Sequence, residues 1–253
     1  MITETEGIVL RQTKISGGRR MILIFTKQYG KISAGTSLNE KGKGKQALAL
    51  RPFTYGNYQL YSKGEFYSIN SGDPISSFYG IGEDVDKYMN ASYALEMADK
   101  VTAEGMPAPG LFNLTVDMLR EMENRKSKYE TLVLAYAVKT LKHLGITPEL
   151  GTCTRCGASA MSLQAEGKAI FFSIADGGII CEDCRLADND SLIYKIDFGI
   201  IDILRYFEEN PLENLRKLAL EEEVCKRILK MITEYMRYHF GFGEMKSEIF
   251  VTG

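Results

Sequence analysis

The chain has 253 residues, of which 45% are apolar and 25% charged, and its 31 Lys and Arg against 33 Asp and Glu give a formal net charge of −2. This composition is that of an ordinary globular protein and excludes a disordered, collagen-like or membrane-embedded chain. The start of the chain does not resemble a secretory leader and no apolar run approaches the ~18 residues of a membrane span, so we expect a soluble cytoplasmic protein with reduced thiols.

The small net charge hides two parts of opposite sign. Residues 1–80 hold 11 Lys and Arg against 5 Asp and Glu, a surplus of 6, whereas residues 81–253 hold 20 against 28, a deficit of 8. This polarity predicts that the first part binds a polyanion and that the acidic second part binds protein partners.

The first 80 residues have the pattern of short strands separated by glycine-rich turns. Alternating apolar residues predict five strands, at residues 7–13, 21–26, 31–35, 53–60 and 66–70. Five short strands with a long third connection favour a small Greek-key barrel of the OB-fold type, with an SH3-like barrel or an open sheet as alternatives.

Basic residues gather in the turns of this first part. Lys and Arg on glycine-rich backbone can follow a phosphate chain without one fixed geometry, which suits sequence-independent nucleic-acid binding. The aromatic residues Tyr29, Phe53, Tyr55 and Tyr58 could stack on bases, although alternating aromatic residues in strands more often form the core. The candidate DNA-binding residues are Lys14, Arg19, Arg20, Lys41, Lys43, Lys45 and Arg51.

Beyond Gly82 the apolar spacing becomes helical. Helical spacing is found at residues 85–98, 111–122, 134–141, 200–207 and 224–239. A short, irregular and glycine-rich insert at about 151–190 interrupts this pattern. We therefore expect a mixed α+β protein, with an OB-fold-like barrel domain at residues 1–80 and a helical domain at residues 81–253 that contains the insert.

The insert holds four of the five cysteines in two C-x-x-C motifs, Cys153/Cys156 and Cys181/Cys184. Each motif lets two thiolates reach one ion from a tight turn, and together they complete a tetrahedral set of four sulfurs, which suits one structural Zn²⁺ ion. Disulfides are not expected in a cytosolic chain, and a redox C-x-x-C motif normally lies in a βαβ pattern, which is absent here. An iron–sulfur cluster is the main metal alternative. The fifth cysteine, Cys225, is expected to be a buried and inert thiol.

Signatures of catalysis are scarce. The segment Gly30–Thr36 has the glycine spacing of a phosphate loop, but Thr36 stands where that loop needs its Lys. The two histidines, His143 and His239, lie in predicted helices, and no G-x-S-x-G motif is present. A zinc-dependent nucleic-acid enzyme would need an open position on the metal, which four thiolates do not leave. We therefore expect a protein that is not an enzyme.

Several short segments, spread over the whole chain, carry a family resemblance. In the first part they are Gly7–Leu10, Arg20–Thr26, Tyr29–Lys31 and Leu50–Phe53. In the second part they are His143–Pro148, the two cysteine motifs with Phe172-Ser173 and Gly177-Gly178 between them, Tyr238–Gly241 and Lys246-Ser247. In their order and spacing, these segments resemble the RecO family of bacterial DNA repair proteins.

The resemblance implies an N-terminal OB-fold, a helical C-terminal domain and a four-Cys zinc module. It implies a recombination mediator of the RecF pathway that binds single- and double-stranded DNA and anneals complementary strands. With RecR, such a protein helps to load RecA onto DNA coated by single-strand-binding protein (SSB), whose C-terminal tail it binds, and it is cytoplasmic and nucleoid-associated. The family's basic surface then falls on Arg19, Arg20, Lys41, Lys43 and Lys45, and its metal ligands fall on the four motif cysteines.

The chain departs from the family pattern at two places. Gly17-Gly18 stand where family members often have a carboxylate, and Arg51 stands where Gln is common. Both changes make the barrel more basic, and Arg51 is assigned to the DNA-binding face on its charge alone. The alternative function is a zinc-containing protein-interaction scaffold without direct DNA binding, in which the basic loops are merely solvated.

Overall fold

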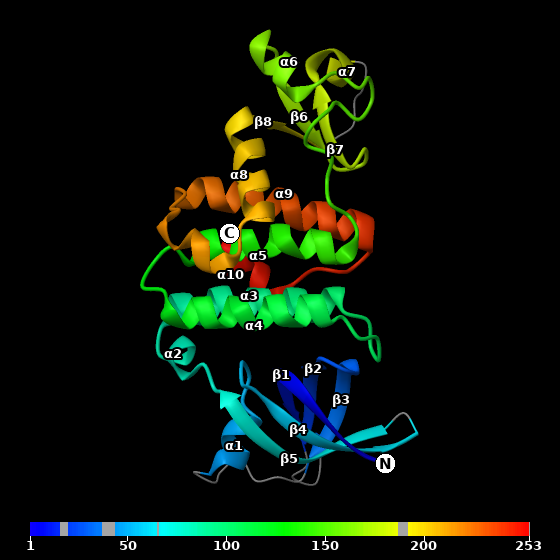
Figure 1. Ribbon diagram of the computed structural model, residues 1–253, viewed down its shortest axis with the longest axis vertical. Helices are drawn as coiled ribbons and strands as arrows, with labels where there is room; N and C mark the ends of the chain where they lie inside the picture. Colours follow the sequence, from blue (N-terminus) through cyan, green and yellow to red (C-terminus); the bar gives the residue numbers. More distant parts are fainter. Residues whose placement is uncertain (16–19, 37–43, 65, 187–191, 253) are drawn as a thin grey trace. The chain divides into compact units, whose positions relative to one another are not determined.

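The computed structural model describes residues 1–15, 20–36, 44–64, 66–186 and 192–252. Figure 1 shows a strand-rich N-terminal part, a series of helices, and a second, smaller sheet late in the chain. Within the described part of the chain, no helix has both the length and the apolar character needed to cross a membrane.

Five strands form a closed N-terminal barrel. They are β1 (Ile2–Lys14), β2 (Arg20–Thr26), β3 (Gly30–Thr36), β4 (Tyr55–Lys63) and β5 (Phe66–Ser76). Around the barrel the order is β1-β2-β3-β5-β4, and β4 pairs with β1 to close it. All neighbouring strands are antiparallel except β3 and β5. The predicted five-stranded barrel is therefore confirmed, and its closure excludes the open sheet.

The barrel core follows from the alternation of each strand. On β2, Ile22 and Ile24 are fully buried, and on β4 Tyr58 and Leu60 are fully buried. Phe53 retains 7% of its surface and Tyr58 retains none, so neither side chain is available as a stacking platform for bases. The short helix α1 (Lys45–Ala49), which the apolar pattern does not predict, places Ala49 in the same core.

Packing groups the barrel with the first long helices in one compact unit, which comprises Met1–Tyr129 and Met245–Phe250. Besides α1, its helices are α2 (Tyr79–Gly82), α3 (Val85–Val101), α4 (Pro109–Asn124) and the 3₁₀ helix η3 (Lys246–Glu248).

The motif Tyr29–Lys31 joins β3 to these helices. Gly30 has a φ of +66°, and a Cβ there would lie 2.0 Å from the carbonyl oxygen of Met106 in the α3–α4 connection. The next residue, Lys31, forms an ion pair of 2.9 Å with Asp99 of α3. The change from strands to helices falls between Ser76, the end of β5, and Tyr79, the start of α2, while by packing α3 and α4 belong with the barrel.

The second compact unit comprises Glu130–Glu244 and Val251–Gly253. Its long helices are α5 (Tyr129–Leu144), α8 (Phe198–Glu209) and α9 (Glu222–Phe240). The shorter helices are α6 (Ala160–Ala165), α7 (Glu182–Leu186) and the 3₁₀ helix η2 (Leu212–Lys217). The boundary between the two units falls within α10 (Ile249–Thr252). α5 is buried without interruption from Thr131 to Val138, whereas α9 is amphipathic and ends at Gly241, whose φ of +79° suits a glycine.

A small three-stranded sheet is the centre of the cysteine-rich insert. Its strands are β6 (Ile170–Ser173), β7 (Gly178–Cys181) and β8 (Ile193–Ile196), in the order β7-β6-β8. Three contacts with α9 hold it: the rings of Phe172 and Tyr235 pack edge to face at 5.4 Å, His239 Nε2 lies 2.6 Å from the carbonyl oxygen of Ile174, and the hydroxyl of Tyr194 in β8 donates a hydrogen bond to the carboxylate of Glu234. The predicted helical region with a four-cysteine insert is confirmed.

Candidate metal centre and nucleic-acid interface

The four motif cysteines converge on one point of the insert. Cys153 and Cys156 lie in the loop before α6, Cys181 ends β7, and Cys184 lies in α7. Their four Sγ atoms all lie within 4.8 Å of one another. Two sequence motifs separated by 24 residues are thus brought together as the spacing predicts.

Local hydrogen bonds hold the first motif in a tight turn. The N–H of Gly157 donates to the carbonyl oxygen of Cys153 at 2.8 Å, and Gly157 has a φ of +76°, which a residue with a side chain rarely adopts. Across the two motifs, the N–H of Cys181 donates to Cys153 Sγ at 3.4 Å. The backbone therefore directs N–H groups at sulfur, which stabilises a thiolate.

This arrangement lowers the pKa of the Cys153 thiol and raises that of the Cys184 thiol. Burial alone would raise the pKa of the Cys153 thiol, but hydrogen bonds from the backbone N–H groups of Cys156, Cys181 and Arg155 lower it to about 6. Burial and the neighbouring sulfurs raise the pKa of Cys184 to about 12. The thiolate of Cys153 therefore forms readily near neutral pH, whereas the thiol of Cys184 keeps its proton until a cation binds.

The sulfur spacing fits a single tetrahedral ion. Sulfurs about 2.3 Å from a central zinc lie about 3.8 Å from one another, and Cys156 Sγ and Cys181 Sγ are 3.7 Å apart. An iron–sulfur cluster contains several irons and bridging sulfides, and so needs its cysteines farther apart than one ion does. The four cysteines can therefore hold one metal ion.

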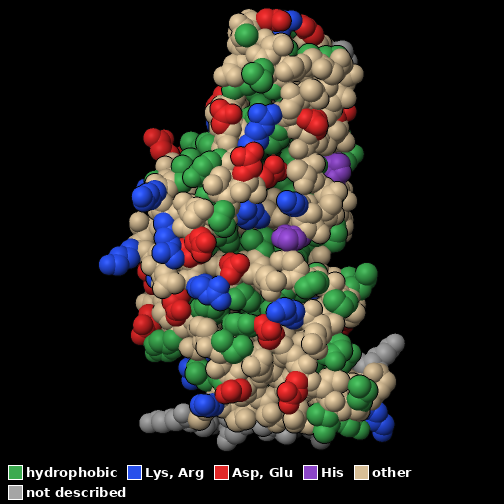
Figure 2. All heavy atoms as spheres, in the orientation of Figure 1, with side chains coloured by type: hydrophobic (Ala, Val, Ile, Leu, Met, Phe, Trp, Pro, Cys, Tyr) green, Lys and Arg blue, Asp and Glu red, His purple; other side chains and the backbone are tan. Residues whose placement is uncertain are grey.

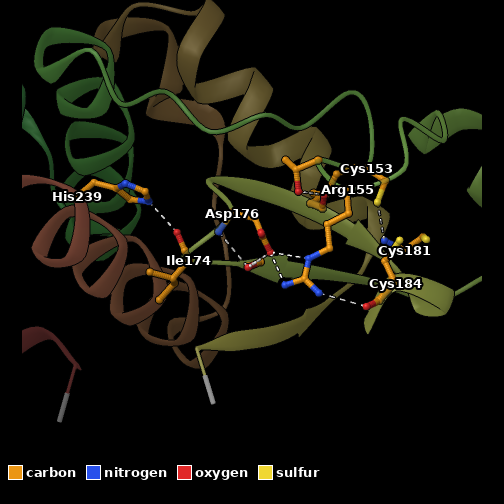
Figure 3. Close-up of polar contacts among 10 residues, drawn as sticks. Cys153, Arg155, Ile174, Asp176, Cys181, Cys184 and His239 are labelled. Atoms are coloured by element: carbon orange, nitrogen blue, oxygen red, sulfur yellow. Dashed lines mark hydrogen bonds and ion pairs between the residues drawn. The ribbon is translucent and has the colours of Figure 1, made fainter. Parts of the chain in front are cut away.

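The insert also contains a polar network that its sequence spacing does not reveal. Arg155, inside the first motif, forms an ion pair of 2.7 Å with Asp176 in the β6–β7 turn (Figure 3). It also donates to the carbonyl oxygen of Cys184 at 3.3 Å. The signal in the sequence is weak, because a charged pair 21 residues apart has no spacing rule. Cys225 lies outside this network and is buried beside Thr131, as predicted.

Two of the predicted DNA-binding residues face each other at one end of the barrel. Lys14 is paired with Arg20 across β1 and β2, and Arg20 is paired with Thr36 across β2 and β3. Lys14 is exposed and Arg20 is half-buried, with its guanidinium beside the side chain of Gln12. The connections that follow Lys14 and Thr36 therefore leave from the same end of the barrel. The predicted residues Arg19, Lys41 and Lys43 belong to these connections and lie outside the described residues.

The other two predicted residues lie at α1. Lys45 begins this helix and Arg51 follows its end, and both are exposed. Lys45 Nζ is 3.8 Å from Asp73 Oδ1, and it borders a hollow of about 360 Å³ whose lining includes the carboxylates of Glu4 and Asp73. The carboxylates of Glu4 and Asp73 disfavour a phosphate inside this hollow.

Two further barrel lysines are engaged within the protein. Lys27 pairs with Glu6 at 3.0 Å, and Lys31 pairs with Asp99. On the face drawn in Figure 2, Lys and Arg side chains are interspersed with Asp and Glu, and the described residues there form no large area of one charge. Of the 11 Lys and Arg in the first 80 residues, five lie in strands, and the other six lie between strands in the sequence: Arg19, Lys27, Lys41, Lys43, Lys45 and Arg51.

Comparison with known proteins gives matches to both parts of the chain. The family model for the N-terminal domain of recombination protein O matches residues 1–78, and the model for its C-terminal domain matches residues 82–248. The two models therefore meet at the change from strands to helices.

Whole-length relatives agree with these matches. The DNA repair protein RecO of Alkaliphilus metalliredigens is 30% identical over 94% of this chain and 94% of its own length. The RecO protein of Bacillus pumilus is 29% identical over 99% of this chain and 94% of its own length. The RecO protein of Caldanaerobacter subterraneus is 27% identical over 93% of this chain and 92% of its own length. The chain therefore belongs to the RecO family of DNA repair proteins.

Proposed function

We propose that this protein is a recombination mediator that binds single- and double-stranded DNA, anneals complementary strands and, with RecR, helps to load RecA onto SSB-coated DNA. The observation that carries the proposal is the match of both family domains over nearly the whole chain. The basic surplus of the first 80 residues supports the DNA-binding part of it.

The DNA-binding surface in this proposal is one end of the barrel. The strand order supports an OB-fold, a barrel that commonly binds oligonucleotides. Lys14 and Arg20, paired across β1 and β2, and Lys45 and Arg51 at α1 are the described cations that we assign to the phosphates. Arg19, Lys41 and Lys43, which lie outside the described residues, complete the proposed set. Neutralising phosphates reduces the repulsion between two strands, which is how such a surface promotes annealing.

The acidic remainder of the chain supports a role in binding protein partners. Its deficit of 8 charges disfavours phosphate contacts, and we assign RecR and the SSB C-terminal tail to it. The localisation that follows from this role is cytoplasmic and nucleoid-associated.

The four motif cysteines hold one structural Zn²⁺ ion in this proposal. Four thiolates complete a tetrahedral shell and leave no position for a reacting water. The ion links the two motifs and stabilises the insert, and the proposed protein is not an enzyme.

The test is a fluorescence-anisotropy titration with a single-stranded oligonucleotide at several salt concentrations. A triple variant, Lys41→Glu, Lys43→Glu and Lys45→Glu, should bind at least tenfold more weakly at low salt. Its slope of log affinity against log salt should fall by about 2, because each lost phosphate contact removes about 0.7. The matched control, Lys126→Glu, Lys217→Glu and Lys230→Glu, changes the net charge equally on exposed helical and loop sites and should bind like the unaltered chain. Equal losses in both variants would show that only net charge matters.

An annealing assay with SSB-coated complementary oligonucleotides tests the mediator role on the same sample, with metal content measured in parallel. Annealing without strand cleavage is the expected result, and metal-dependent cleavage would contradict the non-enzymatic proposal.

The scaffold function remains the second candidate because Lys27, Lys31 and Lys45 each lie within 4 Å of a carboxylate. It predicts no DNA binding even at low salt.

A further inference from the structure

Arg155 lies between the two cysteines of the first motif, but its side chain contacts other parts of the insert (Figure 3). Its Nε and Nη2 lie 2.9 and 2.7 Å from Asp176 Oδ2, in the β6–β7 turn. Its Nη1 donates to the carbonyl oxygen of Cys184 at 3.3 Å. One side chain thus joins the first motif, the hairpin turn and the second motif.

The acceptor of this ion pair is itself held in place. Ser173 Oγ donates to Asp176 Oδ2 at 2.6 Å, and the N–H of Asp176 donates back to Ser173 Oγ at 3.2 Å. The adjacent Ile174 carbonyl accepts from His239 of α9. The side chains of Arg155 and Asp176 keep 26% and 28% of their accessible surface, so water screens the pair less than a fully exposed one.

We propose that Arg155 is a positioning residue for the metal site: it holds the two cysteine motifs at the spacing of a metal tetrahedron without touching the ion. The inference rests on the proposed metal-binding function of the four cysteines. The motifs are separated by 24 residues, and the N–H of Thr154 already joins the first motif to the carbonyl oxygen of Ile179 in β7. Without the Arg155 bridge, metal binding would have to supply more of the ordering of Cys184 against the first motif. A bridge formed within the protein fold removes part of that entropy cost and raises metal affinity.

Charge acts in the same direction. Four thiolates around a divalent ion carry a net charge of −2, and a guanidinium beside the Cys184 carbonyl offsets part of it. Arg suits this position better than Lys, because its planar fork can donate to two acceptors at once whereas an ammonium is a point charge.

The test measures Zn²⁺ affinity of the full chain by competition with a chromogenic chelator, and the ligand set by the absorption spectrum of the Co²⁺-substituted protein. Arg155→Gln and Asp176→Asn should each weaken Zn²⁺ binding about tenfold. The double variant should also bind Zn²⁺ about tenfold more weakly, because both substitutions remove the same bridge. Arg155→Lys should recover only part of the affinity. The Co²⁺ spectrum should show four thiolate ligands in every variant.

The matched control is Lys168→Gln. Lys168 forms an ion pair of 3.2 Å with Asp183 inside the second motif, and it is not part of the bridge between Arg155 and Asp176. The Zn²⁺ affinity of this variant should therefore stay within twofold of that of the unaltered chain. If the unaltered chain binds one Zn²⁺ and Arg155→Gln binds it equally well, the positioning role is overturned while the metal site stands. If Arg155→Lys binds as tightly as the unaltered chain, charge alone accounts for the effect and the bridging role is overturned. If the unaltered chain binds no metal, the metal site itself is wrong.

Discussion

Tyr58 is a fully buried tyrosine whose hydroxyl makes a specific contact in the barrel core. Its Oη donates to the carbonyl oxygen of Ala49 at 2.6 Å, and burial raises the pKa of its hydroxyl. The hydrogen bond joins β4 to the last residue of α1. It explains why this aromatic residue belongs to the core and does not stack on bases.

We expect Tyr58→Phe to lower the free energy of unfolding by about 1–2 kcal/mol, because a buried carbonyl loses its donor while the ring still fills its place. Denaturant titration measures the change. Tyr61→Phe, at a residue on the same strand with 43% of its surface exposed, is the control and should change stability by less than about 0.5 kcal/mol. Equal effects in both variants would contradict the assigned role of the Tyr58 hydroxyl.

At the scale of elements, η3 is attached to α3 by one carboxylate. Glu96 accepts hydrogen bonds from the N–H groups of Lys246 and Ser247, at 3.0 and 2.8 Å, and from Ser247 Oγ at 2.6 Å. Burial alone would raise the pKa of Glu96, but these hydrogen bonds hold it below its ordinary value of 4.5. The segment Lys246-Ser247, which contributes to the family resemblance, is thus hydrogen-bonded to a residue of α3 that lies 150 positions earlier in the sequence.

The lowered pKa of Glu96 predicts a pH-dependent contribution to stability. At a pH between the folded and unfolded pKa values of Glu96, the unfolded chain binds more protons at this carboxyl than the folded chain does. The contribution of Glu96 to the free energy of unfolding is therefore complete above about pH 4.5 and is lost as the pH falls through the lower folded pKa. We expect Glu96→Gln to cost about 1–2 kcal/mol at pH 7 and progressively less below pH 4.5. Denaturant titrations from pH 7 to pH 3 measure it. The exposed Glu104→Gln is the control, and a Glu96→Gln deficit that does not shrink in acid would contradict the assignment.

The elements differ in how well the sequence predicts them. The alternation around Tyr58 and Leu60 predicts a strand because strand periodicity is local. It does not predict α1, which has only five residues, too few to show a helical period. The cysteine spacing predicts the metal site because two short motifs each contain their own geometry. The bridge from Arg155 to Asp176 could not be predicted, because it depends on a hairpin turn that brings together residues far apart in the sequence.

At the scale of the whole molecule, the predicted DNA-binding residues and the candidate metal ligands lie in different regions of the sequence. The predicted DNA-binding residues all lie before residue 52, whereas the four motif cysteines lie between residues 153 and 184. The barrel and the insert also belong to different compact units. Packing nevertheless assigns α3 and α4 to the barrel unit, which the sequence could not show, because contacts such as Lys31 with Asp99 connect residues 68 positions apart. Stability of the insert and DNA binding by the barrel should therefore be separable.

Removing the metal tests this separation. We expect a chelator, or the variants Cys153→Ser and Cys181→Ser, to abolish the single bound metal and to lower hydrogen-exchange protection about a hundredfold or more within residues 149–196, because structural zinc contributes folding free energy directly. Protection of the barrel strands should not change, and affinity for single-stranded DNA should stay within about twofold. Cys225→Ala, which removes the one cysteine outside the motifs, should retain one metal per chain. If DNA affinity fell with the metal while the barrel stayed protected, the insert itself would have to contact DNA, and the assignment of DNA binding to the barrel alone would be wrong.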